Sequence, residues 1–121
     1  MERVPTPSEV GALLRPLDDL DKKVLGGLVA LWMAAPARVR DREWTAQQFV
    51  QVATVAHGFD GEHGPATNDD VERIRVYAQQ RMDRVVCCGL ALFVRVAADL
   101  RERGGGATFA DAQAAVVGYL G

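Results

Sequence analysis

The sequence predicts an all-α protein, a compact bundle of about five helices with a long central fourth helix. Apolar residues recur at spacings of three and four along most of the chain, and no alternating stretch of useful length predicts a sheet. Four segments pair a threonine with an acid or amide three residues later, a pattern typical of helix starts. These segments begin at Thr6, Thr45, Thr67 and Thr108.

Length and composition favour a single helical domain over residues 1–121. The chain is 49% hydrophobic and 25% charged, with a net charge of −2. These are ordinary globular values, and the charge offers no overall attraction to nucleic acid or to an acidic membrane. The longest apolar run, Val85 to Val94, is far shorter than the roughly 20 residues that cross a bilayer. We expect a cytoplasmic protein with no signal peptide and no membrane association.

The first two helices are expected from Thr6 to about Leu14 and from about Asp18 to Ala35. Residues 1–5 are expected to form a loose tail, and Pro16 ends the first helix because it disfavours helical geometry in the residue before it. The second helix has Asp18 as its cap and an apolar stripe of Leu17, Leu20, Val24, Leu28, Leu31 and Ala35, widened by Leu25, Val29 and Trp32.

A third helix is expected to begin at Thr45, after a basic connector over residues 37–43, and to end at Gly58. Trp44 before the cap and Phe49 after it match the hydrophobic staple. Its buried stripe is predicted to be Phe49, Val52, Ala53 and Ala56.

The fourth helix is expected from Thr67 or Asn68 to Arg103. Its spine is Val71, Ile74, Ala78, Met82, Val85, Cys88, Leu92 and Val96. The run Val85 to Val94 is apolar on all sides and is expected to be fully buried. Gly89 is expected to pack against the Gly26–Gly27 pair; a break of the helix near Asp83 or Gly89 is the alternative.

The chain ends in a short fifth helix. Gly104, Gly105 and Gly106 are expected to end the fourth helix, and Thr108 starts the last one. Its buried face is predicted to be Phe109, Ala112, Val116, Tyr119 and Leu120. The adjacent Cys87 and Cys88 are expected to be buried, reduced thiols, because a disulfide between neighbours is strained.

One cluster carries metal-ligand side chains, namely His57, Asp60, Glu62 and His63. Histidine and carboxylates this close could bind a divalent metal, but a solvated polar loop is the favoured interpretation. We expect no metal, no cofactor and no catalytic residues. If the protein were an enzyme, His57 or His63 would supply acid–base chemistry near neutral pH.

Arginines are the remaining candidates for a functional surface. The chain has twelve arginines and two lysines. The candidates for binding a partner or DNA are Arg38, Arg40, Arg42, Arg73, Arg75, Arg81 and Arg84. The third and fourth helices could form a helix-turn-helix with the fourth in the major groove, although residues 59–66 exceed the usual turn. A solvated face and a protein interface are the other two interpretations.

The leading functional hypothesis is a non-enzymatic helical protein–protein interaction module, such as an adaptor, a regulator or an inhibitor of a larger assembly. Its basis is strong helical patterning, an uneven charge distribution and no motif that carries chemistry. Residues 58–72 contain five acids and no lysine or arginine, whereas residues 73–103 contain seven arginines. A helix-turn-helix-like DNA-binding transcription regulator is the alternative. Because the fourth helix is longer than a compact domain of this size, we expect a homodimer or a complex with a partner protein.

Overall fold

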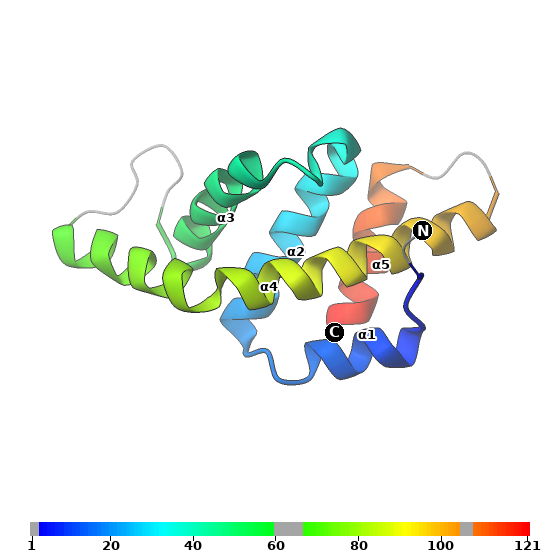
Figure 1. Cartoon of the computed structure of the whole chain (residues 1–121), viewed down its shortest axis with the longest axis horizontal. Helices are drawn as coiled ribbons and strands as arrows, with labels where there is room; N and C mark the ends of the chain where they lie inside the picture. The colour runs from blue at the N-terminus through cyan, green and yellow to red at the C-terminus, as the bar shows by residue number, and fades with distance from the viewer. Residues whose placement is uncertain (1–2, 60–66, 105–107) are drawn as a thin grey trace.

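A computed structural model describes residues 3–59, 67–104 and 108–121. Those residues form five α-helices and one 3-10 turn (Figure 1). The helices are α1 (Pro7–Leu14), α2 (Asp19–Ala34), α3 (Arg42–Ala56), α4 (Asn68–Glu102) and α5 (Phe109–Leu120), and η1 (Pro36–Arg38) joins α2 to α3. No strand occurs in the described ranges, so the predicted all-α class with a long fourth helix is confirmed.

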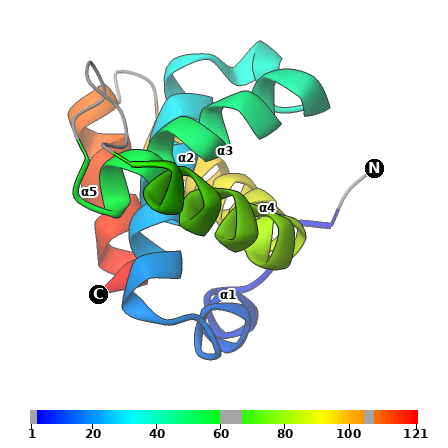
Figure 2. The same cartoon turned by 90° about the vertical axis from the view of Figure 1, so that its left-hand side faces the viewer.

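Helix α4 crosses one side of the molecule from end to end. In Figures 1 and 2, α3 and α1 flank it on opposite sides, while α2 and α5 lie behind it. Helix α2 contacts α3, α4 and α5, and is therefore the hub of the core. Its residues Val24, Leu25, Leu28, Val29 and Trp32 are all fully buried.

The predicted caps at the starts of four helices are confirmed. Thr6, Asp18 and Thr108 each form a full capping box, in which the cap side chain and the acid three residues later bond to one another's backbone amides. Thr67 caps α4 by accepting a hydrogen bond from the amide of Asp70 over 3.1 Å. Helix α4 runs unbroken for 35 residues, about 52 Å, so the predicted continuity is confirmed and the break near Asp83 or Gly89 does not occur.

The predicted start of the third helix is wrong. The cap is Asp41, whose carboxylate accepts a hydrogen bond from the amide of Trp44 over 3.0 Å. Thr45 lies inside α3 and is buried, and its Oγ1 accepts a hydrogen bond from Nε1 of Trp32 over 3.3 Å. The hydroxyl of Thr45 therefore accepts a hydrogen bond from a buried indole and does not cap a helix. Trp44 does not precede the cap, as a hydrophobic staple would require. At the other end Gly58 adopts a φ of 91°, as expected of a residue that ends a helix.

The predicted contact between Gly89 and the Gly26–Gly27 pair is also wrong. A Cβ on Gly89 would lie 3.1 Å from Cζ3 of Trp32, so this glycine makes room for the indole. Gly26 faces Leu120 of α5, and Gly27 faces Val52 of α3. The three glycines therefore admit large side chains from three different helices, and no pair of backbones meets.

The run Val85 to Val94 is not buried on all sides, contrary to expectation. Val85, Cys88 and Leu92 are buried, whereas Cys87 is exposed and Leu90 is 38% exposed. The other helices pack around only part of α4, so apolar residues on its outer side stay in contact with solvent. The expectation of two buried thiols is correct only for Cys88. None of the described helices is long and apolar enough to cross a membrane.

Candidate functional site

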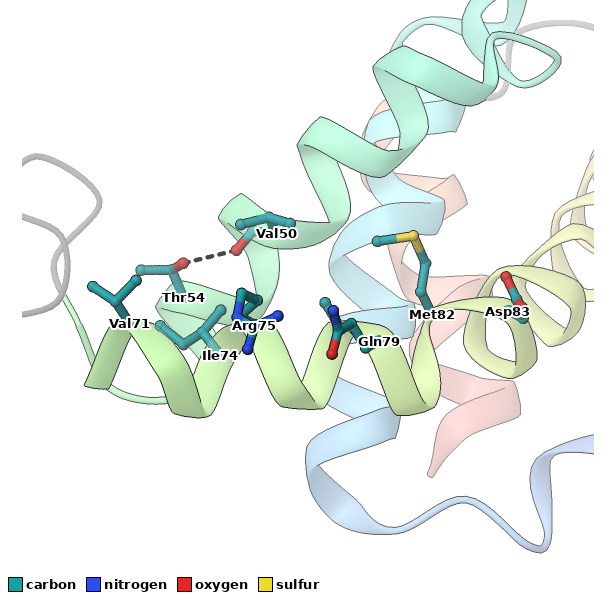
Figure 3. Close-up of a pocket in the computed structure, with 9 residues that line it drawn as sticks. Val50, Thr54, Val71, Ile74, Arg75, Gln79, Met82 and Asp83 are labelled. Carbon is teal, nitrogen blue, oxygen red and sulfur yellow. Dashed lines mark hydrogen bonds between the residues drawn. The ribbon is translucent and has the colours of Figure 1, made fainter. Parts of the chain in front are cut away.

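A groove between α3 and the first half of α4 is the candidate site (Figure 3). It has a volume of about 580 Å³. We call it the α3–α4 groove; its lining residues are Val50, Thr54, Val71, Ile74, Arg75, Ala78, Gln79, Met82 and Asp83. Figure 3 shows Val50 and Thr54 on α3, and Val71 and Ile74 on the facing part of α4.

The surface of this groove is mostly apolar. Ile74 and Ala78 form its floor and are buried, with 4% and 7% of their surface exposed. Val50 and Val71 stand at its edges and are 42% and 48% exposed. The two valines and the floor between them together form exposed apolar surface, whereas a single exposed valine is ordinary. Val71 was predicted to belong to the buried spine, and that prediction is wrong because α3 does not close over the start of α4.

Two of the polar side chains at the groove, Thr54 and Arg75, bond to other groups of the protein. Oγ1 of Thr54 donates a hydrogen bond to the carbonyl of Val50 over 2.7 Å. Arg75 forms an ion pair with Glu72, and its Nε donates to Glu72 over 2.9 Å. The hydrogen bond from Arg75 lowers the pKa of the Glu72 carboxyl. Among the lining residues only Arg75 and Asp83 carry charge, and none is a histidine, cysteine or serine. The lining of the groove is therefore mostly apolar, with one positive and one negative side chain.

A second groove continues along α4 from Met82 and Asp83, which line both. It lies between η1, the start of α3 and the second half of α4, and has a volume of about 1040 Å³. Val86, Leu90 and Phe93 are among its apolar lining residues, and Arg40 and Arg42 lie on the opposite wall. One side of α4 thus exposes apolar surface over most of its length.

Three of the seven candidate arginines form ion pairs with acids within the described ranges. Arg38 pairs with Asp41 over 3.1 Å, and Arg75 pairs with Glu72. Arg81 pairs with Asp21, a fully buried carboxylate at the start of α2. Tyr77 also donates a hydrogen bond to Asp21 over 2.8 Å. Arg81 therefore fixes α4 to α2, a structural role that the sequence pattern did not reveal.

The other four candidates are exposed, namely Arg40, Arg42, Arg73 and Arg84. They do not form one cluster. Arg40 and Arg42 line the second groove beside α3. Arg73 and Arg84 are eleven residues apart on α4, about three turns, so they share one side of that helix. Neither is among the residues that line either groove.

The predicted histidine and carboxylate cluster is only partly within the described residues. Asp60, Glu62 and His63 lie outside them. Nδ1 of His57 lies 2.6 Å from the carbonyl oxygen of Ala53, one turn earlier in α3. The imidazole also packs edge-on against the ring of Tyr77, with ring centroids 5.2 Å apart. Within the described ranges, no three metal-ligating side chains come together.

Neither groove was predicted from the sequence, although the apolar residues of α4 contain a signal for both. On α4 the buried set includes Ile74, Val85, Leu92 and Val96, and a second apolar set is offset from it around the helix. Val86, Leu90, Phe93 and Val94 belong to that second set. If α4 is taken to be buried all round, both apolar sets are assigned to the core. A helix packed on one side can bury only one of the two sets.

Comparisons of the chain with protein-family models, with curated proteins and with solved structures found no match.

Proposed function

We propose that this protein is a non-enzymatic interaction module that binds an amphipathic helix of another protein in the α3–α4 groove. The observation that carries the proposal is the exposure of Val50 and Val71 on either side of a floor made by Ile74 and Ala78. A surface of this kind loses contact with water when apolar side chains of a partner enter it, which is the main driving force of such association.

The form of the groove favours a helical partner. It is bounded by two helices, and a helix laid between them presents anchor residues at spacings of three, four and seven. Its volume of about 580 Å³ has room for a few large side chains. Asp83 lies at one end, so a lysine or arginine on the partner would be favoured there. The unpaired cysteines are consistent with action in a reducing compartment such as the cytoplasm.

DNA binding through the arginine-rich fourth helix is the weaker proposal. Arg38, Arg75 and Arg81 are neutralised by acids of this chain, which leaves fewer charges for phosphate. Its test is the charge reversal of Arg73 and Arg84, because reversing Arg81 would leave the buried Asp21 without its partner. If DNA binding is the function, duplex affinity falls steeply with added salt and is lost in Arg73→Glu/Arg84→Glu.

Affinity capture with matched groove and control variants tests the proposed function. Wild-type protein and the variants Val71→Asp and Val117→Asp are each immobilised and exposed to nuclease-treated lysate of the source cells. Val117 is 65% exposed on α5 and lines neither groove, so it controls for an added surface charge. We expect a stoichiometric protein partner with wild type and Val117→Asp, and its loss with Val71→Asp. Equal capture by all three proteins would contradict a role for the groove.

A further inference from the structure

The outer side of α4 carries a regular set of residues, of which one, Asp83, also lines the α3–α4 groove. We call this set the outer seam; its members are Asp83, Cys87, Leu90, Val94, Ala97 and Arg101. Successive members are four, three, four, three and four residues apart. This alternation is the spacing by which two helices pack along one another in a coiled coil.

Four members of the outer seam, Asp83, Cys87, Leu90 and Arg101, are exposed, and Val94 and Ala97 are half-buried. Leu90 and Leu92 are two positions apart, about 200° around a helix at 100° per residue, and Leu92 is fully buried while Leu90 is 38% exposed. Cys87 is exposed as well. Figures 1 and 2 show the described helices on the sides of α4 and behind it, and none in front of it.

The order of residues along the seam is self-complementary. It reads acid, cysteine, leucine in its first half and valine, alanine, arginine in its second half. When two such seams run antiparallel, Asp83 of each copy lies opposite Arg101 of the other. Leu90 then lies opposite Val94, and Cys87 lies opposite Ala97. An isologous two-fold contact of this kind uses one patch twice, so every favourable pair occurs twice.

We propose that two copies of this chain form a dimer by antiparallel packing of their outer seams, with Asp83 of each copy paired with Arg101 of the other. The charges at the seam ends support a second copy as the occupant. Within the described part of the chain, neither Asp83 nor Arg101 forms an ion pair. An acid and a base at mirrored ends of an apolar seam set an antiparallel register for a second copy, because a parallel pair would bring like charges together.

The second groove adds apolar surface beside the seam. The seam residues Asp83, Cys87, Leu90 and Val94 line this groove themselves, and Val86 and Phe93 line it beside them. A helix packed on the seam would cover part of these side chains as well as Leu90. The seam shares Asp83 with the α3–α4 groove, but it does not use Val50 or Val71. The proposed dimer rests on the proposed interaction function in one respect: it names a second copy of this chain as one protein partner.

Charge reversal tests the register. Sedimentation equilibrium measures the dimer dissociation constant of wild type, Asp83→Arg, Arg101→Asp and the double variant. Each single reversal places two arginines or two aspartates opposite one another, so we expect roughly tenfold or greater weakening. The double reversal restores the pairs, so its dissociation constant should return close to that of wild type. A wild-type protein that stays monomeric from micromolar to submillimolar concentration would overturn the proposal, as would a double variant no tighter than the singles.

Disulfide trapping tests the antiparallel direction independently. The variant Ala97→Cys places a second thiol opposite Cys87 of the other copy and should form an intermolecular disulfide under mild oxidation. In this register the two native Cys87 residues are ten residues out of step, about 15 Å along the helix, so wild type should not form one. Arg73→Cys is the control, because position 73 lies outside the seam. Efficient cross-linking of wild type through Cys87 would indicate parallel packing and contradict the proposal.

The two proposals can fail separately. Leu90→Asp should be monomeric and still capture the partner of the α3–α4 groove, because Leu90 does not line that groove. Val71→Asp should lose that partner and remain dimeric. If wild type is dimeric but captures no partner, the result supports the dimer through the outer seam and contradicts the proposed function of the groove.

Discussion

Asp21 at the start of α2 is fully buried and forms an ion pair with Arg81 in the middle of α4. Tyr77, one turn before Arg81, donates a hydrogen bond to the same carboxylate. A second set of the same composition lies near the other end of α4, where Asp99 accepts hydrogen bonds from Arg95 over 2.9 Å and from Tyr119 of α5 over 2.6 Å. These two sets fix α4 against α2 and α5. They therefore determine which sides of α4 remain exposed to solvent.

Removing the charge of Asp21 should destabilise the protein. Asp21→Asn keeps the volume but leaves Arg81 and Tyr77 without their carboxylate, and hydrogen bonds to a charged group contribute ~1.5–3 kcal/mol each. Because Arg81 is partly exposed and water can solvate it, we expect a loss of about 2–3 kcal/mol in the free energy of unfolding. Denaturant titration measures it. Asp19→Asn, an exposed acid of the same helix turn, is the control; an equal loss in both variants would contradict the assigned role.

The stability of the protein should fall in acid, and Asp21 should account for part of the fall. Burial acts to raise the pKa of Asp21, but hydrogen bonds from Arg81, Tyr77 and the Asp18 amide outweigh it and hold the pKa below its usual value. The same balance, with Tyr119 and Arg95 as donors, lowers the pKa of Asp99. An acid whose pKa is lower in the folded state stabilises fully above its unfolded pKa, about 3.9, and less as pH falls through the folded value.

The measurement is the free energy of unfolding between neutral pH and the acid limit of the folded state. Wild type should lose stability mainly below about pH 4, where the unfolded chain binds more protons. Asp21→Asn should start lower and fall less steeply over the same window. Parallel curves for the two proteins would show that Asp21 does not titrate as the ion pair requires.

Gly89 should not tolerate a large side chain. A Cβ there would lie 3.1 Å from Cζ3 and 3.5 Å from Cη2 of Trp32, whose indole is fully buried and cannot retreat. We expect Gly89→Leu to cost ~1–3 kcal/mol or more through overpacking. Gly118→Ala in α5 is the matched control, since nothing lies within 4 Å of its added Cβ. That variant should gain up to about 1 kcal/mol of helix propensity. Thermal melts of the two variants should shift in opposite directions.

Thr45 should matter for its hydroxyl rather than for a helix cap. Thr45→Val keeps the shape but leaves Nε1–H of Trp32 buried without an acceptor, at a cost of about 1–3 kcal/mol. Thr45→Ser keeps the hydroxyl and should cost less. If Thr45 were the cap of α3, the valine variant would also fray the first turn, whereas we expect unchanged helicity by circular dichroism. A valine variant as stable as the serine variant would contradict the hydrogen bond to Trp32.

Local signals in the sequence were sufficient for most helix boundaries. The caps at Thr6, Asp18, Thr67 and Thr108 depend on residues within one turn, so they can be predicted without knowledge of the tertiary structure. The prediction failed at Thr45 because two acceptable caps compete there. Asp41 caps the helix, and the hydroxyl of Thr45 is recruited by Trp32, thirteen residues earlier on α2.

The candidate site was harder to predict, because exposure depends on which helices pack on which side. Val71 continues the apolar spacing of Ile74 and Ala78, and nothing local distinguishes an exposed rim from a buried floor. The arginines posed the same difficulty. Arg81 looks like Arg73 and Arg84 in the sequence, yet only the packing of α4 against α2 brings Arg81 to a buried acid.

Site-specific photo-cross-linking in living source cells tests the proposed protein-binding groove most directly. A benzophenone amino acid is placed at Val71 on the rim of the groove, and at Val117 on α5 as the control of comparable exposure. We expect one discrete cross-linked polypeptide from position 71, absent from position 117 and lost when Val50→Asp is added. The same weak, diffuse products from both positions would contradict it.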